Sequence, residues 1–258
     1  MRNGALVIAG KDLRNLFFSP LFWIISAICT FVWSFTFFIA VRDFASKTLT
    51  QAAETQGQGG GLNLHIELVS THFAWVHVFM IFAVSALTMR LFTEEKRQRT
   101  YDLLLTAPVT ATDIALGKVI AGTLTAWALL ALSALYPMSL AFFGPLDWGP
   151  LFAGYLGLML LIAGYVAIGI FASSLTDSPV VSVILSLVFS FMLWLIGAAG
   201  DASDSTVPSR LLEQMNVSAH ITKYMRGSIS IAGFVFFAGI VAFFTFLTQR
   251  IVESSRWR

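Results

Sequence analysis

Long apolar segments alternate with short polar segments along almost the whole chain. Six segments hold about 20 mostly apolar residues each, the length that a helix needs to cross the roughly 30 Å hydrocarbon core of a bilayer. These segments are too long for membrane-spanning strands, and they lack an alternation of period two. The pattern therefore predicts an all-α integral membrane protein, one domain over residues 1–258, with six transmembrane helices. The predicted spans are residues 20–41, 73–92, 118–143, 150–175, 179–199 and 229–248.

Proline positions support the ends of these spans. Ser19 followed by Pro20 is typical of a helix start, because serine caps the first turn and proline is tolerated at the first helical position. Pro150 and Pro179 open the fourth and fifth spans in the same way. Pro137 lies inside the third span, where we expect it to kink the helix.

Composition supports a membrane location. The chain is 57% hydrophobic and 12% charged, whereas soluble domains have about 45–50% apolar and roughly 25% charged residues. No Asp, Glu, Lys or Arg lies in the middle of a predicted span. That absence argues against a proton-coupled carrier or a voltage-gated channel, since both need ionisable groups within the membrane.

The placement of Lys and Arg predicts the orientation of the chain. With both termini in the cytoplasm, the cytoplasmic segments hold 11 Lys and Arg residues and the external segments hold 5. Positive residues concentrate on the cytoplasmic side of membrane proteins. We therefore expect cytoplasmic N- and C-termini and an even number of spans.

Three segments outside the spans have distinct patterns. Residues 1–18 mix apolar and charged positions, which favours a helix lying in the membrane interface, with a disordered lead-in as the alternative. Residues 42–72 are rich in Gly and Gln and predict a flexible external loop. Within residues 199–228 we expect external re-entrant helices before the sixth span, carrying Leu211, Leu212, Met215 and Val217.

The segment FTEEKRQRTYDLLLTAPV, between the second and third spans, concentrates charge in an otherwise apolar chain. We expect the helix to leave the membrane after Phe92 and to carry an ion pair between Glu95 and Arg99, which are four residues apart. Pro108 should end this helix, because the residue before proline avoids the helical conformation. Thr112 is the expected cap of the next helix.

Three consecutive leucines, Leu103, Leu104 and Leu105, follow the charged residues. They cannot enter the bilayer core while their charged neighbours stay hydrated. They can rest on the membrane interface or enter a groove on a cytoplasmic partner. The alternative is a solvated loop that only satisfies the preference for positive charge in the cytoplasm.

The stretch EEKRQRTYDLLLTAPVTATDIALGK resembles the signature of ABC type-2 exporter permeases. In that family, acidic residues precede a Thr, an acidic-Leu-Leu group and a Pro, and a Gly-Lys pair follows. The resemblance covers the whole chain and is closest to the gliding-motility-associated permease branch, although Arg99 stands where that branch often has glycine. The matching residues are Glu94, Glu95, Thr100, Asp102, Leu103, Leu104, Pro108, Gly117 and Lys118.

This resemblance implies a cytoplasmic coupling helix that fits a cleft on a separate ATPase subunit. The leucines would form the apolar anchor, and the charged residues would form a polar rim that sets the register. No cofactor is expected on this chain, and ATP and Mg²⁺ would bind to the partner ATPase. The docking residues would be Glu94, Glu95, Arg97, Arg99, Thr100, Asp102, Leu103, Leu104, Leu105 and Pro108.

The resemblance also implies partners and a location. We expect an ABC ATPase subunit, a second permease copy or a related permease, and membrane lipid as partners, with a periplasmic accessory protein as a further candidate and no nucleic acid. The location would be the bacterial cytoplasmic (inner) membrane. The function would be export, or mechanical work at the membrane, driven by ATP. The alternatives are a non-transporting scaffold that links an ATPase to a periplasmic machine, and a free-standing channel or secondary carrier.

Other patterns argue against catalysis by the chain itself. It has no GxxxxGK[ST] motif for ATP and no GxSxG motif of a serine hydrolase, so we expect no enzyme activity on this chain. His72 and His77 have Met80 nearby, but their spacing of five is not a clean ligand pair on a helix. We interpret both histidines as hydrogen-bonded interior residues, or as residues facing the outer aqueous layer, rather than as metal ligands.

Glycines in the fourth span favour close packing between helices rather than a pore, because small residues let helix backbones approach one another. They are Gly154, Gly157, Gly164 and Gly169.

Overall fold

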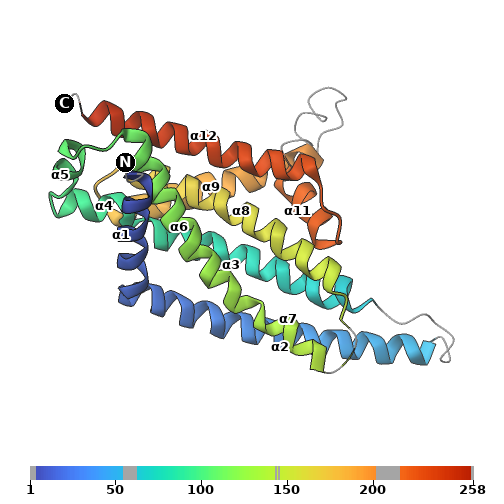
Figure 1. The fold of residues 1–258 in the computed structure, drawn as a ribbon. Coiled ribbons are helices and arrows are strands. Elements are labelled where there is room, and N and C mark those ends of the chain that lie inside the picture. Colours follow the sequence, from blue (N-terminus) through green and yellow to red (C-terminus); the bar gives the residue numbers. More distant parts are fainter. Residues whose placement is uncertain (1–3, 55–62, 143, 145, 202–215, 257–258) are drawn as a thin grey trace.

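The computed structural model describes residues 4–54, 63–142, 144, 146–201 and 216–256. Every regular element among these residues is a helix, which confirms the predicted all-α fold (Figure 1). In chain order the elements are α1 (Gly4–Phe18), α2 (Pro20–Glu54), the π-helix η1 (His65–Val69), α3 (Ser70–Thr88), α4 (Arg90–Arg97), α5 (Tyr101–Thr106), α6 (Ala111–Ser133), α7 (Leu135–Ser139), the 3₁₀-helix η2 (Leu140–Phe142), α8 (Trp148–Leu175), α9 (Pro179–Asp201), α11 (Val217–Met225) and α12 (Ile231–Ser255).

Five helical stretches are long and apolar enough to cross a membrane. They correspond to the first, second, third, fourth and sixth predicted spans. The fifth predicted span, residues 179–199, falls on α9, whose described apolar part is the shorter helix Pro179–Leu195. The five stretches are Pro20–Ala53, His65–Arg97, Ala111–Phe142, Trp148–Leu175 and Ile231–Ser255.

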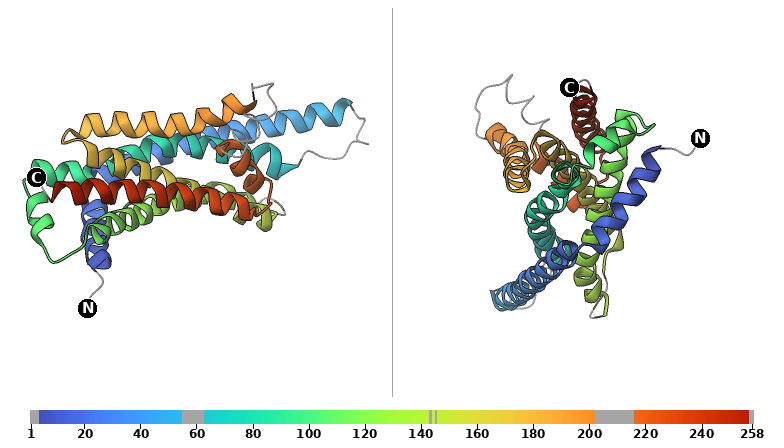
Figure 2. Two further views of the ribbon diagram at one scale, coloured as in Figure 1. Left: turned by 90° about the horizontal axis from the view of Figure 1, so that it is seen from above. Right: turned by 90° about the vertical axis from the view of Figure 1, so that its left-hand side faces the viewer.

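The long helices lie side by side and form an elongated bundle (Figures 1 and 2). Helix α1 turns away sharply from α2 and crosses one end of the bundle (Figure 1). The predicted N-terminal helix is therefore present, and residues 4–18 are not a disordered lead-in. Both ends of the chain lie at the same end of the bundle as α4 and α5, whereas α11 lies at the opposite end (Figure 1).

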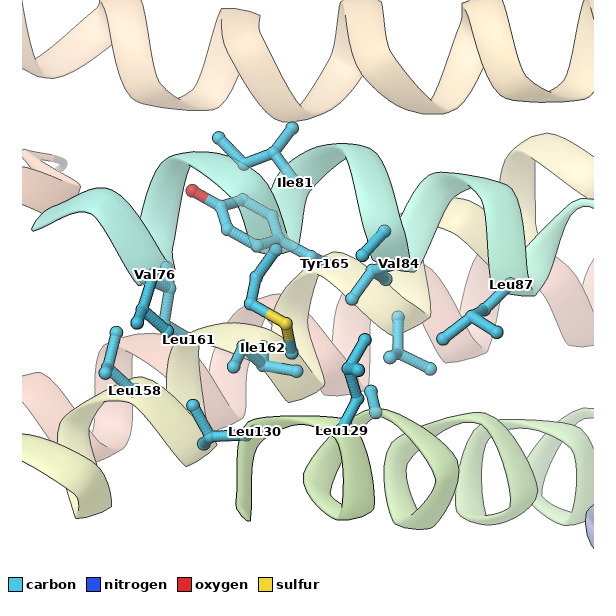
Figure 3. Packing of buried hydrophobic residues seen from close by; sticks show 14 of the residues in the cluster. Val76, Ile81, Val84, Leu87, Leu129, Leu130, Leu158, Leu161, Ile162 and Tyr165 are labelled. Atoms are coloured by element: carbon cyan, nitrogen blue, oxygen red, sulfur yellow. The ribbon is translucent and has the colours of Figure 1, made fainter. Parts of the chain in front are cut away.

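The centre of the bundle is an apolar contact between α3, α6 and α8 (Figure 3). Val76 and Val84 of α3 face Leu129 of α6 and Leu158 and Ile162 of α8, and all five side chains are buried. Burial of large aliphatic side chains from three helices holds these helices at fixed separations, because protein interiors are close-packed.

Glycines of α8 allow its neighbours to approach closely, as predicted for the fourth span. A Cβ atom on Gly157 would lie 2.5 Å from the Cβ of Tyr224 in α11. The ring of Phe73 in α3 occupies the corresponding space beside Gly154, and a Cβ on Gly169 would likewise overlap α3. These glycines serve helix packing.

The predicted kink at Pro137 is an interruption between α6, which ends at Ser133, and α7, which begins at Leu135. Proline has no N–H, so the carbonyl of Ser133, four residues earlier, loses its helical partner. That carbonyl instead accepts a hydrogen bond from Nε2 of His72, at 3.2 Å. His72 of α3 therefore bonds to the third predicted span at the break between α6 and α7.

The predicted external loop, residues 42–72, is wrong over most of its length. Helix α2 continues to Glu54, and helix resumes at His65, while residues 55–62 lie outside the described residues. Lys47 pairs with Asp43 one turn earlier on α2 and with Glu67 of η1, both at 3.1 Å. Charged residues that mark the end of an apolar segment here continue the helix rather than end it.

The expected external helices lie partly outside the described residues, because Leu211, Leu212 and Met215 belong to 202–215. Val217 begins α11 and is buried. Asn216 caps this helix by accepting a hydrogen bond from the backbone N–H of Ala219.

Candidate functional site

The charged segment between the second and third spans folds as two short helices rather than one. Helix α4 ends at Arg97, and α5 begins at Tyr101. Arg99 adopts a left-handed conformation, with φ of 56°. Its N–H donates to the carbonyl of Lys96, and the N–H of Thr100 donates to the carbonyl of Glu95. This is a Schellman motif, in which a left-handed residue ends a helix.

The conformation of Arg99 is one that glycine adopts more readily. A left-handed conformation costs a non-glycine residue roughly 1–2 kcal/mol. Glycine avoids this cost because it has no Cβ. The same turn separates Arg99 from Glu95, so the predicted ion pair between them is wrong, and none joins them in the described structure.

Helix α5 presents apolar and charged side chains at the end of the bundle. Leu103 is 70% exposed, whereas Leu104 and Leu105 are partly buried against the core. Tyr101 is buried and packs edge-on against Phe92, with 6.1 Å between the ring centroids. This burial raises the pKa of Tyr101 above its ordinary value. The helix is therefore anchored by its first residue and leaves Leu103 free to contact a partner.

The remaining predicted docking residues lie on α4, on α5 and in the segments that flank α5. Glu94 of α4 is half-buried. Helix α5 ends at Thr106, before an extended Ala107, as predicted from Pro108. The exposed residues are Arg97, Arg99, Thr100, Asp102 and Pro108.

Helix α8 holds the break between α3 and α4. Ser173 Oγ donates to the carbonyl of Met89 at 2.9 Å and accepts from the N–H of Phe92 at 3.2 Å. Lys96 Nζ donates to the carbonyl of Ser174 at 2.8 Å. A movement of α4 would have to break these bonds or move α8 with it.

A buried ion cluster joins α1, α4 and α6. Lys118 of α6 is fully buried, and its Nζ lies 3.0 Å from Asp12 of α1 and 2.8 Å from Glu95 of α4. It also donates to the carbonyl of Leu91 at 2.5 Å. Lys11 of α1 pairs with Glu95 at 2.7 Å. Burial alone would lower the pKa of Lys11, but its hydrogen bond and ion pair with Glu95 raise it above its ordinary value.

This cluster changes the role of Glu95, since its carboxylate faces inward and holds α4 in place. Three of its members, Lys11, Asp12 and Lys118, were not among the predicted docking residues. The Gly-Lys pair of the family signature was the available signal. Gly117 is the point where α1 crosses α6, because a Cβ there would lie 2.8 Å from both the carbonyl oxygen of Ala5 and the Cβ of Ile8.

The loop after α5 is fixed where it enters α6. Thr110 caps α6 in a capping box with Asp113: the Asp113 N–H donates to Thr110 Oγ1 at 3.1 Å, and the Thr110 N–H donates to Asp113 Oδ2 at 3.0 Å. The predicted cap at Thr112 is therefore wrong. Arg256, at the end of α12, donates to the carbonyl of Val109. The last span thus contacts the segment that carries α5.

The histidines are hydrogen-bonded interior residues, as predicted. Nε2 of His77 lies 2.8 Å from the hydroxyl of Tyr165, and Nε2 of His72 bonds the carbonyl of Ser133. Among the described residues, no group of three or more His, Cys, Asp or Glu is placed to hold a metal ion.

Comparison with known families gives one match that covers nearly the whole chain. The model of the family described as ABC-2 family transporter protein matches residues 6–256. The match includes α1 from Leu6 onward, the α4–α5 segment and all of α12. None of the curated proteins compared with the chain matches it.

Proposed function

The chain belongs to the ABC-2 family of transporter proteins, and we propose that it is a permease subunit that couples ATP hydrolysis by a separate cytoplasmic ATPase to export. A permease of this family implies an ABC ATPase as partner. Membrane domains of this family are normally non-catalytic, so ATP and Mg²⁺ belong to the partner chain. The proposed location is the bacterial inner membrane, with a second permease copy or a related permease completing the transporter.

The ATPase docks on α5 in this proposal. The observation that carries it is the 70% exposure of Leu103 on a short helix at the end of the bundle. Asp102, Arg97 and Arg99, which are close to this leucine in the sequence, are exposed and carry charge of both signs. An apolar anchor inside a charged rim is the usual anatomy of a protein–protein interface.

The contacts of α4 support transmission of force from this interface to the spans. Lys96 and Glu95 connect α4 to α8, α6 and α1 through buried or half-buried polar contacts. A docked ATPase that shifts α5 and α4 would therefore shift several spans together. A rigid connection of this kind favours a two-state rocking motion over a local loop movement.

The arrangement of the chain ends supports α9 as a sixth span. Five crossings would leave the two ends on opposite sides of a membrane. Both ends lie at the end of the bundle that carries α5 (Figure 1). Six crossings reconcile these observations, and docking to a cytoplasmic ATPase then places both termini in the cytoplasm.

Substitution of Leu103 by aspartate tests the docking surface. We expect Leu103→Asp to abolish co-purification of the ATPase in detergent, because loss of a central apolar anchor costs about 2 kcal/mol or more, roughly 30-fold in Kd. Ile229→Asp is the matched control, because Ile229 is 69% exposed, close to the 70% of Leu103, and lies two residues before α12 rather than on α5. Both variants should reach the membrane fraction.

Undiminished ATPase binding by Leu103→Asp would remove α5 from the interface. Equal loss in Ile229→Asp would show that the effect is not specific to α5. Leu103 is a sharper probe than Leu104 because Leu104 packs partly against the core, where aspartate would also disturb the fold.

A further inference from the structure

A cavity of about 620 Å³ lies between α1, the start of α2, the end of α3 and α4. Its volume is in the range of sites that bind small ligands, about 300–1,000 Å³. One part of its wall is apolar and includes Phe18, Leu21 and Phe22. Another part is polar and includes Arg90 and Glu94 of α4. A ligand that fills this cavity must be amphiphilic.

The charges along the wall reduce to one unpaired cation and one unpaired anion. Asp12 and Glu95 also line the cavity, but each is paired with Lys118 and Lys11 in the buried cluster. Arg90 has no such partner among the described residues.

The guanidinium of Arg90 donates only to the hydroxyl of Ser19, at 3.2 Å. The carboxylate of Glu94 accepts a long hydrogen bond, 3.4 Å, from Gln98. Arg90 and Glu94 are one helical turn apart, and no ion pair joins them in the described structure. Arg90 is therefore available to a negative group of a ligand, and Glu94 is available to a positive group of the same ligand.

We propose that this cavity binds the zwitterionic headgroup of an ethanolamine phospholipid. Arg90 would hold the phosphate, because the planar guanidinium matches phosphate oxygens with two parallel hydrogen bonds. Glu94 would accept hydrogen bonds from the primary ammonium. Arg90 and Glu94 are separated by one turn of helix, and the phosphate and ammonium that they would bind are separated by a two-carbon linker. The apolar wall would contact the start of the acyl chains.

The same wall selects against other common headgroups. An anionic headgroup without an amine would place its negative charge near Glu94 with no compensation. A choline headgroup carries no N–H, so it cannot donate to the Glu94 carboxylate. Selectivity for a primary amine thus comes from Glu94, and affinity for the phosphate comes from Arg90.

The position of the cavity suits a lipid rather than a soluble ligand. It adjoins the turn from α1 into the first span, where Phe18 is 78% exposed and Trp23 is also exposed. Aromatic side chains concentrate at the level of lipid headgroups. The guanidinium of Arg14 lies 5.7 Å from the centre of the Phe18 ring, which places a further cation at this level. The proposal requires α1 to lie at the membrane surface and does not depend on ATPase docking.

Lipid retention by the purified full-length chain tests this proposal. The chain would be extracted in mild detergent and titrated with phosphatidylethanolamine, phosphatidylglycerol or phosphatidylcholine in mixed micelles, with bound lipid measured by native mass spectrometry. We expect one phosphatidylethanolamine per chain at high affinity. Arg90→Gln should weaken its binding about tenfold, as expected for loss of a charge-assisted hydrogen bond.

Glu94→Gln should change selectivity rather than abolish binding. It should bring phosphatidylglycerol to within about threefold of phosphatidylethanolamine, because the repulsion of the anionic headgroup is removed. Arg250→Gln and Glu253→Gln are the matched controls, since these residues pair with each other on α12 and do not line the cavity. Both controls should retain the wild-type preference.

Several results would overturn the proposal. One is unchanged phosphatidylethanolamine affinity in Arg90→Gln, or an equal loss in Arg250→Gln. Another is full competition by free phosphoethanolamine at the lipid's own affinity, which would assign the cavity to a soluble phosphate ester. Complete release of the lipid on adding the ATPase would assign the cavity to the protein interface instead. Loss of ATPase binding in Leu103→Asp with intact lipid retention would leave this proposal standing independently.

Discussion

Replacement of Lys118 by methionine should destabilise the protein more than any single change on its surface. The side chain of Lys118 is fully buried and meets Asp12 at 3.0 Å, Glu95 at 2.8 Å and the carbonyl of Leu91 at 2.5 Å. Its Nζ also lies 4.8 Å from the centre of the Phe92 ring. Methionine is similar in length and shape, so the substitution removes charge and hydrogen bonds while filling most of the space.

The magnitude follows from what remains after the substitution. Two nearly buried carboxylates, Asp12 and Glu95, would face each other with Lys11 as the remaining cation of the cluster. The side chain of Lys11 is half-exposed, so solvent weakens its compensation. Breaking a buried ion pair by removing one partner typically costs about 3–5 kcal/mol. Global stabilities are about 5–15 kcal/mol, so the loss would be a large fraction of the total.

Reversible unfolding in mixed detergent micelles measures this loss. Lys223→Met is the control, because Lys223 is exposed and lies on α11, away from the cluster. Combining Lys118→Met with Glu95→Gln should cost less than the sum of the two single changes, by about 0.5–3 kcal/mol, because the second change removes an uncompensated charge. Equal stability of Lys118→Met and Lys223→Met, or strict additivity in the double variant, would refute a cluster that stabilises the fold.

Two further substitutions test the geometry around the cluster. Gly117→Ala should lower the unfolding free energy by about 1–3 kcal/mol, because the added Cβ forces α1 away from α6. Gly10→Ala is the control and should not lower it, because a Cβ at Gly10 meets nothing within 4 Å. An unchanged unfolding free energy in Gly117→Ala would contradict the close crossing. Arg99→Gly should raise the unfolding free energy by about 1 kcal/mol, because glycine adopts the left-handed conformation without strain. Arg97→Gly, at the end of helix α4, is the control and should lower it. A lower unfolding free energy in Arg99→Gly would contradict the Schellman turn.

The five helices that are long and apolar enough to cross a membrane were predictable, because the length of an apolar segment is a direct physical requirement of the bilayer. The ends of the helices were less predictable. Helix α2 continues to Glu54 through polar residues, since leaving the hydrocarbon core does not end a helix. Contacts of Lys47 with Asp43 and Glu67 extend the helix in water, and Glu67 comes from a distant element that a local pattern does not reveal.

The position of the α4–α5 segment in the fold was predictable in outline, and the contacts that support it were not. The family signature located Leu103 and Pro108, and the structure places both at the end of the bundle. The spacing of Glu95 and Arg99 suggested an ion pair on one helix. However, Arg99 has a positive φ angle, which ends the helix and separates the two side chains. The partners of Glu95 are instead Lys118, 23 positions along the chain, and Lys11 of α1. Both lysines come together because α1 packs against α6.

The family signature can be understood through this arrangement. Gly117 admits the backbone of α1, and the adjacent Lys118 then reaches Asp12 on that helix and Glu95 on α4. The pair therefore acts as a joint between the N-terminal helix, the third span and the segment that precedes Leu103. Backbone breaks lie on both sides of α5, at Arg99 and at Ala107, but Tyr101 at the start of α5 is anchored against Phe92 of α4. Force applied at Leu103 would then pass through α4 to α1, α6 and α8 together, which is the property that a coupling element requires.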